Sequence, residues 1–200
     1  MNNQLLIATG NPGKMVEIKE ILHPLSLSLC SPLDLDLALK VKETGQTYSE
    51  NARLKAKAYI NAAGLPVLSD DSGLEVDALN GAPGLFSARF SPKKNANDAD
   101  RRNYLIQQLA GKPRPWRAKF YCTAILALPD GRHFETTGCC KGVIIPEERG
   151  STGFGYDPVF LLPKYGKTMA ELGPEIKNKI SHRARALQAM LPFLRQVYGK

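Results

Sequence analysis

Residues 4–22 read QLLIATGNPGKMVEIKEIL, and this stretch indicates an α/β fold. The apolar run from Gln4 to Ala8 predicts a short buried strand, and apolar residues at helical spacing follow the loop. The loop itself, Thr9 to Lys14, is Gly-rich; Asn11 is a good N-cap and Pro12 fits the first turn of a helix. We therefore expect a strand, a Gly-rich loop and a helix, in that order.

The rest of the chain continues this alternation of helical and strand patterns. The expected elements are a helix from Ser49 to Gly64, a short strand from Pro66 to Ser69, a helix from Asn97 to Ala110, strands from Arg117 to Leu128 and from His133 to Ile145, a strand from Pro158 to Leu162, and a C-terminal helical segment that Ser181 can restart and Pro192 should bend or interrupt. Residues 129–131, Pro-Asp-Gly, predict a hairpin turn. We predict a single α/β domain over residues 1–200, with a central mixed sheet flanked by helices and bent into two lobes.

Composition is that of an ordinary globular protein, with 43% hydrophobic and 23% charged residues among 200. There is no apolar run long enough to cross a bilayer, and the first residues lack the pattern of a signal peptide, so we expect a cytoplasmic protein with no membrane partner. The four cysteines, Cys30, Cys122, Cys139 and Cys140, lack CxxC spacing. We expect them to serve packing, not disulfides.

The formal net charge of +8 calls for a polyanionic partner, which is either nucleic acid or a small molecule rich in phosphate. Basic residues are scattered along the chain, and they do not interleave with aromatic residues as in nucleic-acid-binding modules. We expect no stable nucleic-acid complex, although charge alone does not decide.

The first candidate site is the loop TGNPGK, which comprises Thr9, Gly10, Asn11, Pro12, Gly13 and Lys14. A Gly-rich turn before a helix leaves backbone N–H groups free to face an anion, and Lys14 adds a positive charge for phosphate oxygens. The spacing fits neither a Walker A loop nor a dinucleotide fingerprint. An ordinary strand-to-helix turn is the alternative.

The second candidate is SDDSG, residues 69–73, where Asp70 and Asp71 are expected at the end of a buried strand. Open α/β sheets bind their ligands there, and paired carboxylates suit Mg²⁺. Carboxylates near a phosphate-binding loop would repel phosphate unless a metal ion bridged them. The alternative is an acidic turn capped by Ser72.

Two further segments carry charges that fit a nucleotide. Glu43 could join the metal site, and Lys55, four residues beyond Asn51 on a helix, could reach phosphate. Taken alone, each is more often a solvated surface charge.

The loop GSTGFGYD, residues 150–157, offers the flat rings of Phe154 and Tyr156 for a base, and Asp157 could accept a hydrogen bond from a ring nitrogen. A simple loop that enters the next strand is the alternative.

The last candidate segment is Lys177 with Ser181, His182 and Arg183. The guanidinium of Arg183 has donors suited to the keto oxygen of a purine. A basic face on the terminal helix is the alternative.

Together, these motifs resemble one family. The motifs TGNPGK, ETG followed by SENARLKA, SDDSGLEVDALNGAPGLFSARF, GFGYDPVF and ISHRARAL occur in the order of the Ham1-like inosine/xanthosine triphosphate pyrophosphatases, and most resemble its bacterial RdgB-type dITP/XTP branch. The resemblance runs from about residue 5 to about residue 194, which is nearly the whole chain.

The resemblance implies an ITPase/Maf-like fold with a substrate groove between two lobes, a homodimer, a Mg²⁺ requirement, and purine nucleoside triphosphates (ITP, dITP, XTP) as substrates. It also implies a role for each matching residue. Asp71 is the general base and a metal ligand, Glu43 is a second metal ligand, and the substrate-binding residues are Thr9, Gly10, Asn11, Pro12, Gly13, Lys14, Lys55, Ser72, Phe154, Gly155, Tyr156, Asp157, Lys177, His182 and Arg183. Members often carry an acidic pair before Thr-Gly, whereas this chain has Lys42-Glu43.

Two rival interpretations remain open at the level of sequence. A nucleotide phosphatase or kinase-like transferase could use the same phosphate loop and would yield orthophosphate or a phosphorylated acceptor. A basic nucleic-acid-binding module is supported only by the net charge, and the acidic pair Asp70-Asp71 counts against it.

Overall fold

The computed structural model describes residues 3–199 of the chain. Its strands are β1 (Gln4–Ile7), β2 (Ser28–Cys30), β3 (Val67–Val76), β4 (Trp116–Ala127), β5 (His133–Ile144), β6 (Phe160–Leu162) and β7 (Lys167–Thr168). Its α-helices are α1 (Pro12–Leu22), α2 (Tyr48–Ala63), α3 (Asp98–Leu109), α4 (Met169–Ile180) and α5 (His182–Tyr198). Short 3₁₀ helices lie at His23–Leu25, Leu33–Leu35, Asp77–Leu79, Gly84–Arg89 and Asp157–Val159.

The strands form one seven-stranded sheet in the order β2-β1-β3-β4-β5-β6-β7. Strand β1 pairs in parallel with β2 and β3, whereas β6 pairs antiparallel with β5 and β7. The predicted mixed α/β sheet is therefore confirmed. None of the helices within residues 3–199 is long and apolar enough to span a membrane.

The chain divides into two compact units, and β3, β4 and β5 contribute to both. The first unit comprises residues 1–71, 122–138 and 182–200, and the second comprises residues 72–121 and 139–181. Each unit thus gathers segments that are distant in sequence.

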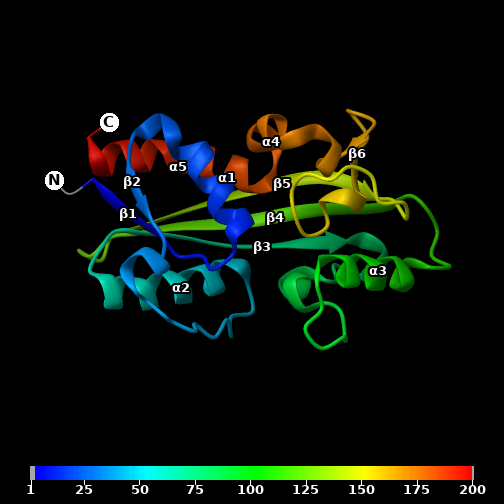
Figure 1. Ribbon diagram of the computed structural model, residues 1–200, viewed down its shortest axis with the longest axis horizontal. Helices are drawn as coiled ribbons and strands as arrows, with labels where there is room; N and C mark the ends of the chain where they lie inside the picture. Colours follow the sequence, from blue (N-terminus) through cyan, green and yellow to red (C-terminus); the bar gives the residue numbers. More distant parts are fainter. Residues whose placement is uncertain (1–2, 200) are drawn as a thin grey trace. The chain divides into compact units, whose positions relative to one another are not determined.

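In the first unit, helices cover both faces of the strands: α1 and α5 lie on one face and α2 on the other (Figure 1). On the first face, Leu5, Ile18 and Leu187 are buried in one apolar cluster, and on the second face, Leu6 and Ala52 are buried in another. The alternation of Leu5 and Leu6 between the clusters follows from the twofold period of a strand.

The second unit has its own apolar core, in which α3 supplies Leu105 and Leu109 and α4 supplies Met169 and Leu172. Helix α3 begins with a capping box in which the side chains of Asn97 and Asp100 each bond the other's backbone N–H. The capping box fixes the start of α3, and the two buried leucines anchor the helix in this unit.

Two boundaries predicted from sequence were wrong. Strand β3 was expected to end at Ser69 but continues through Asp70 and Asp71 to Val76. Helix α2 begins at Tyr48, capped by Thr47 instead of Ser49. In β3, the tertiary partners of Asp70 and Asp71 outweigh the preference of these residues for turns.

The C-terminal segment contains two helices, because Ser181 adopts an extended conformation between α4 and α5. This confirms the helix start that Ser181 made possible. Helix α5 is not interrupted at Pro192 but continues to Tyr198, with Met190 and Leu194 fully buried on either side of the proline. Their burial offsets the hydrogen bond that proline cannot donate.

Candidate functional site

The two acidic residues in β3 lie next to each other in the strand and therefore point to opposite faces of the sheet. Both are buried, with Asp70 at 3% and Asp71 at 8% exposure. Asp70 faces the side of α1 and α5, and Asp71 faces α2, as their contacts below show. One pair of carboxylates therefore belongs to two separate sets of partners.

Three donors converge on one oxygen of Asp70. Its Oδ2 atom lies 3.0 Å from Nζ of Lys14, 3.2 Å from Nε of Arg183 and 3.8 Å from Sγ of Cys122. Its Oδ1 atom is buried and has no hydrogen-bond partner among residues 3–199. Arg183 also pairs through Nη1 with Glu17, so this guanidinium bridges two carboxylates.

The charges around Asp70 set its protonation. Burial alone would raise the pKa of Asp70, but the positive charges of Lys14, Arg183 and Lys55 lower that pKa well below its usual range. Burial and the neighbouring Asp70 charge raise the pKa of Cys122 to about 12. Asp70 is therefore an anion, and Cys122 stays a thiol that donates to it.

The carboxylate of Asp71 contacts two side chains of α2. Its Oδ2 atom accepts a hydrogen bond from Nδ2 of Asn51 at 3.1 Å, and its Oδ1 atom lies 3.5 Å from Nζ of Lys55. Asn51 and Lys55 are four residues apart and thus share one face of the helix. Burial raises the pKa of Asp71, with Lys55 and Lys14 opposing the shift and Glu43 adding to it. A raised pKa makes this carboxylate a stronger base than an exposed one.

Glu43 and Asp71 converge on a single cation, the ammonium of Lys55. Nζ of Lys55 lies 2.6 Å from Oε1 of Glu43 as well as 3.5 Å from Oδ1 of Asp71. Two carboxylates that share one positive group fit a Mg²⁺ ion, which uses one or two carboxylates together with water and substrate phosphates. Within residues 3–199 no cluster of three or more acidic, His or Cys side chains could hold a metal ion by itself.

A loop that includes Thr9 connects β1 to α1 as predicted, and Pro12 to Lys14 form the first turn of the helix. Asn11 is the N-cap of α1, and its side chain accepts a hydrogen bond from the backbone N–H of Lys14. Thr9 supports the loop by accepting from the N–H of Asn11. Gly10, Asn11 and Pro12 are exposed, so the start of α1 is accessible to an anion.

In the second unit, Asp157 and Lys177 form a buried ion pair whose side chains are only 4% and 5% exposed. Oδ2 of Asp157 also accepts a hydrogen bond from the N–H of Phe154, and the Lys177 ammonium lies 4.6 Å from the centre of the Phe154 ring. The next aromatic residue, Tyr156, is anchored by a hydrogen bond from its hydroxyl to the carbonyl of Ser87. The loop therefore has a fixed conformation and leaves Phe154 partly exposed.

The predicted residues thus fall into two groups. The first unit brings together Glu43, Lys55, Asp71, Lys14 and the start of α5 with His182 and Arg183. The second unit brings together Phe154, Gly155, Tyr156, Asp157 and Lys177, and also contains Ser72. For Lys177 and Arg183, at 4% and 1% exposure, the alternative of an exposed basic face is wrong.

No functional role was predicted for Asn51 or Glu17. Asp70 was predicted to pair with Asp71 at one Mg²⁺ site, but the two side chains point to opposite faces of β3 and contact different partners. The four-residue spacing of Asn51 and Lys55 was a signal that both face one partner, and Asp71 is that partner. Glu17 gave no such signal, because its partner Arg183 lies 166 residues further along the chain.

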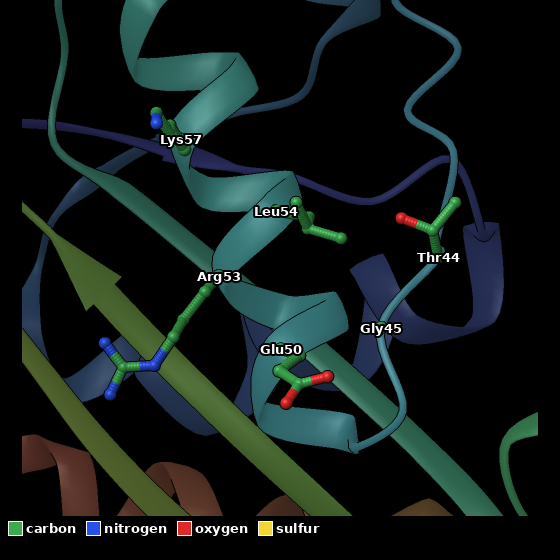
Figure 2. A pocket seen from close by; sticks show the side chains of 6 residues that line it. All are labelled: Thr44, Gly45, Glu50, Arg53, Leu54 and Lys57. Atoms are coloured by element: carbon green, nitrogen blue, oxygen red, sulfur yellow. The ribbon is translucent and has the colours of Figure 1, made fainter.

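A pocket lies between α2 and the segment that precedes it, and is lined by Thr44, Gly45, Glu50, Arg53, Leu54 and Lys57 (Figure 2). None of these six residues is a predicted site residue, and the four on α2 (Glu50, Arg53, Leu54 and Lys57) project from a different side of the helix than Asn51 and Lys55. This pocket is therefore not the candidate site. Its exposed Lys57 can serve as a control for the lysines of the candidate site.

The chain is similar to known proteins along nearly its whole length. Residues 5–193 match the model of the Ham1 family. The chain is 47% identical over 191 residues to a dITP/XTP pyrophosphatase of Thermus thermophilus, covering 94% of this chain and 90% of that protein. It is 43% identical to a dITP/XTP pyrophosphatase of Desulforamulus reducens, covering 98% and 97%. The structure of a HAM1 protein from Coxiella burnetii superposes with a TM-score of 0.86 at 38% identity, covering 96% and 98%.

Proposed function

Because this chain belongs to the Ham1 family, we propose that it hydrolyses the non-standard purine nucleoside triphosphates ITP, dITP and XTP to the monophosphate and pyrophosphate. The observation that carries this proposal is the acidic pair of β3, in which Asp71 has a raised pKa and lies beside Lys55. A base next to a cation is the arrangement that attack by water on a phosphate requires. The resemblance further supports a homodimer in the cytoplasm that removes damaged nucleotides from the pool.

The phosphate chain is bound by residues of the first unit. Lys14 and Lys55 supply positive charge, and the accessible start of α1 adds the partial positive charge of the helix dipole. Glu43 and Asp71 would hold Mg²⁺, which when bound offsets negative charge on the phosphate oxygens. Asn51 keeps the Asp71 carboxylate in one orientation.

Hydrolysis breaks the bond between the α-phosphorus and the oxygen that bridges to the β-phosphate. Asp71 takes a proton from a water molecule as the water oxygen bonds the α-phosphorus, and pyrophosphate leaves with the bridging oxygen. Lysine ammonium groups stabilise the charge that develops on the leaving group. The products are a nucleoside monophosphate and pyrophosphate.

Residues of the second unit bind the nucleoside, and His182 and Arg183 of α5 are proposed substrate contacts within the first unit. The ring of Phe154 stacks on the purine, and Asp157 and Lys177 present polar atoms to its edge. A six-keto group accepts hydrogen bonds, whereas the six-amino group of adenine would leave buried donors unpaired. An unpaired donor costs about 1–3 kcal/mol, which is roughly a fivefold to 150-fold preference per bond.

Product analysis tests this function directly. The protein is incubated with ITP, dITP, XTP, ATP or GTP and Mg²⁺, and pyrophosphate and orthophosphate are measured separately. We expect pyrophosphate from the first three, no activity with EDTA, and recovery when Mg²⁺ is restored. Orthophosphate or a phosphorylated acceptor would instead identify a phosphatase or transferase, and strong salt-dependent DNA binding a nucleic-acid module.

Replacement of Lys14 by alanine tests the phosphate assignment. If Lys14 binds the distal phosphates, Lys14→Ala should weaken binding of a triphosphate more than binding of IMP, and it should slow ITP and ATP in similar proportion. Lys57→Ala, which removes an exposed lysine of α2, is the matched control and should change neither. Equal losses of affinity for ITP and IMP would place Lys14 away from the distal phosphates.

A further inference from the structure

Side chains of helix α3 form hydrogen bonds with the backbone of the proposed nucleoside-binding loop at Gly155. The carboxylate of Asp98 accepts a hydrogen bond from the N–H of Gly155 at 2.8 Å, and Nη1 of Arg102 donates to the carbonyl of Gly155 at 2.8 Å. Asp98 and Arg102 are four residues apart and therefore share one face of the helix. Both polar atoms of one glycine are thus bound by side chains of one helix.

These two hydrogen bonds fix two successive peptide groups. The N–H of Gly155 belongs to the peptide that follows Phe154, and its carbonyl belongs to the peptide that precedes Tyr156. Gly155 has a φ of 63°, a left-handed conformation that glycine adopts at low cost. The hydrogen bonds from α3 to Gly155 therefore set the direction of the neighbouring Phe154 side chain.

Asp98 and Arg102 are each held in place by a further ion pair. Nε and Nη2 of Arg102 each donate to one carboxylate oxygen of Glu148 at 2.8 Å, which is a planar, bidentate pair. Arg101 pairs with the other oxygen of Asp98. Because Leu105 and Leu109 anchor α3 in the apolar core, the helix is a rigid base for both contacts.

We propose that Asp98 and Arg102 are positioning residues that hold Phe154 and Asp157 in the conformation that binds the nucleoside. The inference rests on the proposed function, because it assigns a role in nucleoside binding to residues that do not touch the nucleoside. It separates the two ends of the substrate: α3 acts on the nucleoside end and leaves the phosphate residues of the first unit unaffected.

The test is Arg102→Ala, measured for KM and kcat with ITP and for the binding of IMP and of pyrophosphate. We expect KM for ITP and Kd for IMP to rise about tenfold, as for loss of one hydrogen bond from a charged group. We expect kcat to stay within about twofold and the affinity for pyrophosphate to stay unchanged, because phosphate binding and proton transfer do not depend on α3. Arg53→Ala, which breaks the exposed pair between Arg53 and Glu135, is the matched control and should change none of these values.

A second pair of variants covers the case in which Arg102→Ala does not fold. Asp98→Asn keeps an oxygen that accepts from the N–H of Gly155, whereas Asp98→Ala removes it. We expect Asp98→Ala to weaken IMP binding and Asp98→Asn to restore most of the affinity. A purely structural role would lower the melting temperature and the active fraction of both enzymes without this difference in IMP affinity.

Three results would overturn the proposal: unchanged KM and IMP affinity in Arg102→Ala and Asp98→Ala; equal losses of IMP and pyrophosphate affinity; or a fall in kcat with KM unchanged. Failure of the proposed function looks different, because the wild-type protein would then release no pyrophosphate from ITP. If the wild-type protein also bound no IMP, the nucleoside assignment and this inference would fall together.

Discussion

Asp71→Asn should release pyrophosphate from ITP more slowly than the wild-type protein by a factor on the order of a hundred or more, while the fold is retained. The substitution removes the proton acceptor but keeps the shape of the side chain. An amide oxygen can still accept the hydrogen bond from Nδ2 of Asn51, so the contact between β3 and α2 survives. The measurement is kcat for pyrophosphate release, with circular dichroism and thermal unfolding as checks on the fold.

Two controls separate loss of the base from loss of charge or orientation. Glu135→Gln also removes one negative charge, but from the exposed pair with Arg53, and activity should not change. Asn51→Ala leaves the Asp71 carboxylate in place but removes the hydrogen bond that orients it, so its loss of activity should be smaller. A folded Asp71→Asn enzyme that kept substantial activity would exclude Asp71 as the base.

Local patterns predicted the parts of the fold that depend on neighbouring residues. The first strand, its Gly-rich loop and the cap at Asn11 all follow from a few adjacent side chains, and the structure confirms them. The capping box of α4, in which Thr168 and Glu171 lie three residues apart, is another feature set by nearby residues. In each, the physical cause lies within one turn of the helix, where sequence alone is informative.

Residues 70–73 show where local patterns fail. Asp-Asp-Ser-Gly favours a turn by composition, and the strand was expected to end before it. It forms the middle of β3 because Asp70 and Asp71 are paired with cations from α1, α2 and α5, the most distant being Arg183, 113 residues away. No spacing rule connects such positions.

The same limit applies to the charges of the site. Lys55 and Arg183 were chosen as candidate ligands of the substrate, and sequence gave no indication that each also pairs with carboxylates of the protein. Net charge of +8 describes the whole chain, whereas chemistry depends on which carboxylate lies within about 4 Å of which cation. Only the three-dimensional arrangement supplies that information.

Arg183→Ala has the second large expected effect, and it concerns base selection. We expect kcat/KM for ITP to fall sharply while the already poor activity on ATP barely changes, because the guanidinium can donate to a six-keto group and cannot accept from a six-amino group. The ratio of the two values should therefore shrink. The measurement is kcat/KM for ITP and ATP in both enzymes.

The buried position of Arg183 adds an effect on stability that must be separated from selection. Its guanidinium pairs with Glu17 and Asp70, so its removal leaves two buried carboxylates without this partner and should cost about 3–5 kcal/mol of unfolding free energy. A smaller folded fraction lowers the rates for ITP and ATP equally, and loss of the hold on Asp70 and Lys14 would do the same because both substrates carry the same phosphates. The ratio of kcat/KM values is insensitive to both effects. An unchanged ratio would therefore mean that Arg183 only organises the carboxylates, and the loop from Phe154 to Asp157 would become the better candidate for reading the base.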